Sequence, residues 1–225
     1  MYEIERRTVL FKLPIAAAAF VAVIPEVLRG GTSWEEFTAR TAALAKELQG
    51  VDEDTYVYRL AAETLNAPDV PPGSKTGKFA KLDPPVEFGP VFRGAPIMII
   101  QWKLAPNAWL PPHNHPHYDV VSVGLEGEAV VTHYDVDGDA PPFDATSSFA
   151  VRRTRETLIA RRRASVLTSS RDNIHTFKAG PKGARGIDIN TRAGEDIGFS
   201  FLKIEPKPID AARGTFAARW IGQEP

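Results

Sequence analysis

The amino-acid sequence predicts an all-β protein, a sandwich or closed barrel, preceded by a helical layer. Apolar residues recur at helical spacing only in the first third of the chain, and from about residue 79 onward they alternate with a period of two. Turn residues separate the short apolar runs, and the chain holds 19 prolines and 17 glycines. Short strands at such regular spacing are typical of a β-sandwich or barrel.

Composition limits the classes of function. The 225 residues, of which 43% are hydrophobic and 24% charged, suit one domain with a sizeable core. The formal net charge of -1 gives no general attraction to nucleic acid or to a membrane surface. The count of cysteines is 0, which excludes disulfides, thiolate metal ligands and cysteine nucleophiles. The function must therefore be sought in a local site.

Residues 1–28 have the layout of an export signal. The pair Arg6 and Arg7 precedes an apolar, alanine-rich run and resembles a twin-arginine signal. The run is shorter than the roughly 18–20 residues of a spanning helix and is interrupted by Lys12 and Pro14, so we expect no stable membrane insertion. We expect a periplasmic or otherwise exported protein; a buried N-terminal helix in a cytoplasmic protein is the alternative.

Two helices are expected in residues 32–67. The first begins at the capping box formed by Ser33 and Glu36, and it ends near Gly50. The second begins near Asp52 or Asp54 and ends at the Asn-Ala-Pro sequence that follows Leu65. Their apolar stripes predict a layer that packs against the strands.

The barrel is expected to span residues 79–205, with 206–225 as a C-terminal extension. Residues 96–104 read as a buried strand, and 118–123 and 128–136 as a hairpin around 124–127. Further strands are expected at 149–153, 157–162, 165–168, 175–179, 185–191 and 198–204.

Three of the five histidines, His113, His115 and His117, fall within one short segment that follows two prolines. Imidazole is the commonest protein metal ligand, and a His-x-His pair on an extended segment places both rings on one face. His117 follows Pro116, which breaks the extended path, so His117 is expected to contact the site only from outside. The segment therefore predicts a metal centre that begins with His113 and His115.

The surrounding residues resemble the first motif of the cupin family, in which a His-x-His pair stands between two glycines and is followed by a glutamate. Asn107 takes the place of the first glycine, and Gly127 takes that of the last. This spacing puts Val120, and not Asp119, at the position of the family's glutamate.

The single histidine of the second cupin motif matches His175, with Ser170 and Asp172 in place of the motif's proline and glycine. The resemblance implies a cupin-type double-stranded β-helix, or jelly roll, with a divalent metal on His113, His115 and His175. A carboxylate from Asp119 and a ligand from His117 remain alternatives, and His133 is expected to be a sheet-face residue.

Three histidines without a carboxylate are similar to the cysteine dioxygenase-like branch, which implies Fe(II), a small thiol substrate and O₂. That branch needs no protein-based general base, so no catalytic side chain is assigned. Two departures stand out. Asp188 to Asn190 occupy the place of the branch's His-x-Tyr, and only Arg93 lies upstream as a loose candidate for the arginine that binds a substrate carboxylate.

Several alternatives stay open. An isomerase or hydrolase, or a non-enzymatic cupin that binds a small ligand or stores metal, would use the same barrel. Mn, Ni, Zn and Cu(II) compete with Fe(II) for such a ligand set. A homodimer through sheet edges is possible. The arginine-rich segment 152–163 lacks the interleaved aromatics of single-strand binders, so we expect a polar sheet face and no nucleic-acid partner.

Overall fold

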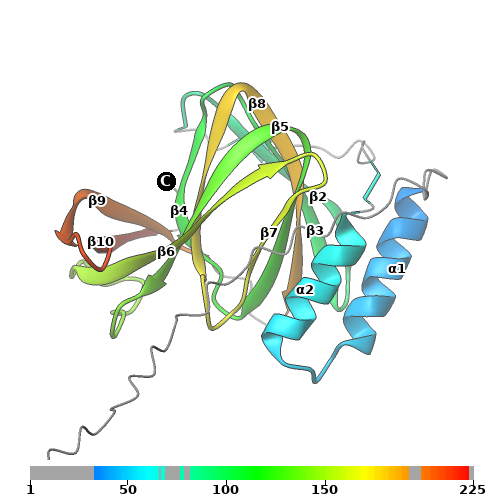
Figure 1. Ribbon diagram of the computed structural model, residues 1–225, viewed down its shortest axis with the longest axis horizontal. Coiled ribbons are helices and arrows are strands. Elements are labelled where there is room, and N and C mark those ends of the chain that lie inside the picture. The colour runs from blue at the N-terminus through cyan, green and yellow to red at the C-terminus, as the bar shows by residue number, and fades with distance from the viewer. Residues whose placement is uncertain (1–32, 66, 69–76, 79–81, 193–198, 223–225) are drawn as a thin grey trace, which may run out of the picture. The chain divides into compact units, whose positions relative to one another are not determined.

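The structure is a computed structural model that describes residues 33–65, 67–68, 77–78, 82–192 and 199–222 (Figure 1). All of these belong to one compact unit that spans Gly31–Pro225. The expected export segment, residues 1–28, lies outside the described residues. None of the described helices is both long and apolar enough to cross a membrane.

The two expected helices are present, and each begins at the side chain that the sequence indicated. Helix α1 spans Trp34–Glu47, and the hydroxyl of Ser33 accepts the N–H of Glu36 at 3.1 Å. Helix α2 spans Glu53–Thr64, and the carboxylate of Asp52 accepts the N–H of Thr55 at 3.0 Å. Such caps satisfy amide groups that have no partner inside the helix, which explains where both helices begin.

The described strands follow in one antiparallel sheet that curls into a barrel. Their bounds are β1 Gly77–Lys78, β2 Val86–Gly94, β3 Ile97–Leu104, β4 Trp109–Asn114, β5 Tyr118–Val136, β6 Phe149–Ala160, β7 Ala164–Leu167, β8 Ile174–Arg192, β9 Phe201–Asp210 and β10 Thr215–Gly222. The order is β1-β2-β3-β8-β4-β9-β10-β6-β5-β7, and β5 also pairs with β8. That extra pairing closes the barrel, so the prediction of an all-β barrel with an N-terminal helical layer is confirmed.

The hairpin expected around residues 124–127 was wrong, because β5 continues through these residues and pairs with β8. Residues 118–136 form one long strand that pairs with β8 along most of its length, with irregular register on either side of Gly127. The glycine is needed, but for a bend: its φ is +64°, and an added Cβ would collide with the carbonyl oxygen of Gly183 in β8. The predicted strands at 175–179 and 185–191 are likewise the two halves of β8.

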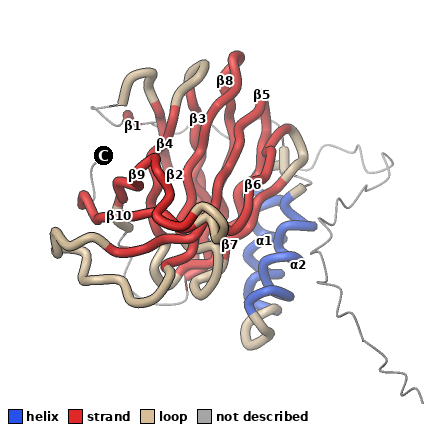
Figure 2. The backbone as a smooth tube through the Cα atoms, turned by 60° about the vertical axis from the view of Figure 1, so that its left-hand side comes forward, coloured by secondary structure: helices blue, strands red, loops and turns tan. Residues whose placement is uncertain are grey.

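The helices cover one outer wall of the barrel, as Figure 2 shows. One buried apolar cluster joins both layers, with Phe37, Leu48, Val57 and Leu60 from the helices and Ile97, Ile99, Val121, Val123, Ile187 and Ile189 from the strands. On β3 the alternate residues Trp102 and Leu104 belong to a second cluster inside the barrel. Val131 of β5 and Phe177 of β8, which lie beyond the register shifts near Gly127, share that cluster. Burial on both faces explains why β3 begins with a continuous apolar run.

The C-terminal residues extend the same sheet. Strand β9 continues past residue 205 to Asp210, and β10, which the sequence did not indicate, pairs with both β9 and β6. A third apolar cluster holds this hairpin, with Phe149, Val151, Ile174, Leu202, Ala218 and Trp220. In Figure 1 the hairpin projects from the side of the barrel opposite the helices.

Candidate metal centre

The structure brings His113, His115 and His175 together from distant parts of the chain. His113 lies near the end of β4, His115 follows that strand directly, and His175 is the second residue of β8. The backbones of His113 and His175 are directly paired between β4 and β8. One possible ligand atom from each residue lies within 4.8 Å of those of the other two, so this group can hold a metal ion.

The ring nitrogens converge on His175. Its Nε2 atom lies 3.1 Å from the Nε2 of His113 and 3.0 Å from the Nε2 of His115. A metal–nitrogen bond of about 2.1 Å would place two ligand atoms at right angles about 3.0 Å apart. A single hydrogen or lone pair on His175 can form a linear hydrogen bond to only one of its two neighbours. A cation would use all three lone pairs at once, so the geometry fits a metal ion.

Polar neighbours hold the ring of His113 and the backbone of His115. The Nδ1 of His113 lies 2.9 Å from the carbonyl oxygen of Pro111, which can only accept, so Nδ1 carries the hydrogen and Nε2 keeps its lone pair. Asn173 holds the backbone of His115: its side-chain oxygen accepts the N–H at 3.1 Å, and its amide donates to the carbonyl at 2.8 Å. The polar neighbours thus match those of ligating histidines.

The three imidazoles are neutral at pH 7. Burial lowers the pKa of His113 to about 4, with a small opposing effect from the Pro111 carbonyl. Burial, and then the neighbouring histidines, hold the pKa values of His115 and His175 well below 6.5. Neutral imidazole is the form that binds metal, so ligation at neutral pH requires no loss of a proton.

Aromatic rings form the surroundings of the cluster. The ring of His113 lies 5.5 Å from that of Phe201 and 6.2 Å from that of Phe199, and the ring of His175 lies 4.8 Å from that of Phe177. His113 and His175 are buried, whereas His115 keeps partial exposure. A small molecule would therefore approach from the side of His115.

The two alternative ligands lie elsewhere. His117 is exposed in a turn with φ +67°. Asp119 accepts the N–H of Ser169 at 2.9 Å, and burial, with the nearby Glu53 carboxylate, raises its pKa to about 6 although the Ser169 bond opposes this. Val120 is fully buried beside Tyr118 and Leu167. Neither His117 nor Asp119 belongs to the group of described side chains that could hold a metal ion.

His133 was expected on a sheet face, and it lies on the inner face of the barrel sheet. It is fully buried, its backbone pairs with that of His175, and the two rings are 5.8 Å apart. Its Nε2 lies 2.6 Å from the hydroxyl of Ser165, and its Nδ1 lies 3.3 Å from the carbonyl of Asp172. Its shared parity with Val131 was the signal that placed it on the inner face.

The structure also places the residues at which this sequence differs from the cysteine dioxygenase-like branch. Asp188 accepts the indole N–H of Trp102 at 2.9 Å, and burial raises its pKa to about 6 against the hydrogen bonds from Ser122 and Trp102. Asn190 is buried. Arg93 is exposed on β2. A substrate-binding arginine is therefore not found at the expected place.

Comparisons with known proteins give structural similarity only. No family model matches the sequence, and no curated protein matches it either. Among solved structures, the chain is similar to KdgF from Halomonas sp. (TM-score 0.35, 16% identity, 51% of this chain and 84% of that one). It is also similar to oxalate oxidase in complex with the substrate analogue glycolate (0.38, 17%, 59% and 56%).

Procruciferin, an 11S globulin from Brassica napus, gives a TM-score of 0.39 at 14% identity and aligns with 52% of this chain but only 27% of its own length. Each of these similarities covers between half and three fifths of this chain. The protein has an all-β barrel, as its own closed sheet shows. In that barrel lies a three-histidine group that can hold a metal ion.

Proposed function

We propose that the protein is a metal-dependent cupin and a non-haem Fe(II) oxygenase that acts on a small molecule, with thiols as the substrate class. One observation carries the proposal: the neutral Nε2 atoms of His113, His115 and His175 converge on one point, and no described carboxylate joins them. The resemblance to the three-histidine branch supports the choice of Fe(II) and of oxygenation.

The charge of this ligand set supports an anionic ligand for the metal. Three neutral imidazoles leave the charge of a divalent ion uncompensated, whereas a carboxylate ligand would cancel part of it. The bound metal would supply open positions at which a thiolate and O₂ could bind side by side. The excess positive charge favours the thiolate form of the substrate over the thiol, so the site needs no side-chain base.

The chain's own residues provide position and a dry environment. The Pro111 carbonyl and Asn173 hold the rings of His113 and the backbone of His115. Phe177, Phe199 and Phe201 lie against the imidazoles and exclude water from that side. Each of these features fits a cofactor that carries the chemistry while the protein sets its geometry.

The substrate is expected to lack a carboxylate. Arg93 is exposed on β2, and Arg155, which lies beside His133, is ion-paired with Asp172 at 3.2 Å. Neither arginine can therefore bind the carboxylate of a metal-bound substrate unless its side chain first leaves its present position. An uncharged small thiol suits the aromatic walls better than an amino acid does.

Oxygen consumption tests the proposal. The Fe(II)-loaded protein should consume O₂ with small thiols that lack a carboxylate, faster than with cysteine, and the His175→Ala variant should not. Turnover without O₂ uptake, or equal function with Zn(II), would instead support an isomerase or hydrolase. Metal binding with no turnover of any thiol would support the non-enzymatic alternative.

Export, which we also propose for residues 1–28, is tested by N-terminal sequencing of the mature protein.

A further inference from the structure

The loop between β7 and β8, residues 168–173, contacts the histidine group. Asn173 binds both backbone polar groups of His115, and His175 follows it by two positions in β8. The preceding residue, Asp172, directs its carbonyl toward the Nδ1 of His133. A displacement of this loop would therefore move two of the three proposed ligands together.

The other side of the β7–β8 loop is bound by the first turn of α2. The hydroxyls of Ser169 and Ser170 donate to the two carboxylate oxygens of Glu53, at 2.6 Å and 2.5 Å. Arg171 forms an ion pair with Asp54. Burial raises the pKa of Glu53, but the hydroxyls of Ser169 and Ser170 lower it, so the pKa lies below its ordinary value.

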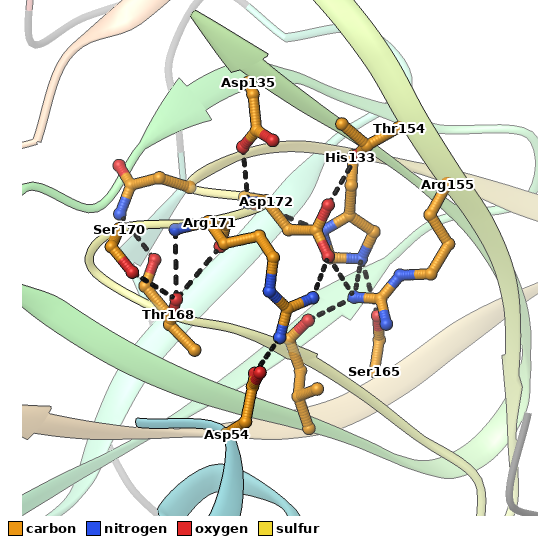
Figure 3. A network of polar contacts seen from close by, with 12 residues as sticks. Asp54, His133, Asp135, Thr154, Arg155, Ser165, Thr168, Ser170, Arg171 and Asp172 are labelled. Carbon is orange, nitrogen blue, oxygen red and sulfur yellow. Dashed lines mark hydrogen bonds and ion pairs between the residues drawn. The ribbon is translucent and has the colours of Figure 1, made fainter. Parts of the chain in front are cut away.

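The contact continues into the barrel through a chain of charges, which Figure 3 shows. Arg171 binds Asp54 on one side and the carboxylate of Asp172 on the other, at 3.1 Å. Asp172 is buried and also binds Arg155 at 3.2 Å and the hydroxyl of Thr154 at 2.5 Å. The network thus connects the surface of α2 with the wall beside His175.

These acids are not needed to dock the helix. The apolar cluster that contains Val57 and Leu60 already fixes α2 against β5 and β7. The side chains of Ser169, Ser170 and Arg171, by contrast, have these two acids as their partners on α2, while the backbone of the loop is also held by the carboxylates of Asp119 and Asp135. The acids at the start of α2 therefore act mainly on the loop, and their removal should leave the fold intact.

We propose that Glu53 and Asp54 are positioning residues: they clamp the β7–β8 loop to α2 and thereby hold His115 and His175 in place for the metal. The inference rests on the proposed metal site and extends it to the helical layer. That layer then has a functional part beyond covering the barrel wall.

The test compares the double variant Glu53→Ala/Asp54→Ala with Glu63→Ala. The control changes an acid of the same helix and breaks the 3.0 Å ion pair between Arg40 and Glu63, which does not involve the loop. In the metal-free protein, we expect amide hydrogen exchange in the loop and at His115 to rise at least tenfold in the double variant alone. In the Co(II)-loaded protein, we expect Co(II) release to be about 10- to 100-fold faster.

The outcomes separate this inference from the proposed function. Unchanged loop exchange in the metal-free double variant overturns the clamp, and so does faster exchange throughout the barrel, because the effect would then be general destabilisation. Faster loop exchange with Co(II) release equal to that of the control overturns the positioning role. If the wild-type protein binds no Co(II), the metal proposal fails, and the exchange measurement still decides whether the clamp exists.

Discussion

The Asp188→Asn substitution should stabilise the protein at neutral pH and should have little effect near pH 4. The pKa of Asp188 is raised from 3.8 to about 6, chiefly by burial, so the folded state binds this proton more tightly than the unfolded state does. Stability contributed by the group is therefore lost as pH rises from about 4 to about 6. The shift corresponds to at most about 3 kcal/mol, less whatever water screening removes.

Asparagine never ionises, and its side-chain oxygen can still accept the indole N–H of Trp102. Urea unfolding of both proteins at pH 4, 5, 6 and 7.5 measures the difference in free energy, which should grow with pH and level off above about pH 6. Asp139→Asn, at an exposed position, is the control and should change stability by less than about 0.5 kcal/mol at each pH. A variant no more stable than wild type at pH 7.5, or a gain equally large at pH 4, would refute the reasoning.

Three further substitutions test the fold and the site. Leu60→Ala, in the cluster that joins the helices to the barrel, should lower the free energy of unfolding by about 2–5 kcal/mol in urea. Gly127→Ala should lower the melting temperature far more than Gly50→Ala, because both glycines have positive φ but only at Gly127 would the new Cβ collide with Gly183. Asn173→Ala should weaken Co(II) binding about 10- to 100-fold in a spectroscopic titration while the protein stays folded; unchanged affinity would contradict the proposed support of the site.

Local signals were enough to predict the helices and the general fold. Ser33 and Asp52 mark the helix starts because a cap depends only on neighbouring residues. The glycines at 124 and 127 were misread as a hairpin turn. Whether a strand turns back or bends depends on its pairing partner, and that partner is β8, which lies far along the chain.

In the candidate site, too, local patterns indicate some residues, whereas long-range pairing decides the position of others. His113, His115 and His175 could be selected because motif spacing carries them, and the structure places them together. His133 shares the parity of Val131, but which residues of β5 point inward beyond Gly127 depends on the register shifts between β5 and β8, which a single sequence does not reveal. The clamp between Glu53 and Ser169 joins residues 116 positions apart, so no local pattern could indicate it.

Metal content tests the central claim most directly. Protein purified from its native compartment, and the variants His175→Ala and His117→Ala, would be analysed for bound transition metals after exhaustive dialysis. Wild type and His117→Ala should retain about one equivalent of divalent metal, since His117 is exposed outside the group, and His175→Ala should retain less than about a tenth. Full metal content in a folded His175→Ala variant, or none in the wild type, would contradict the three-histidine site.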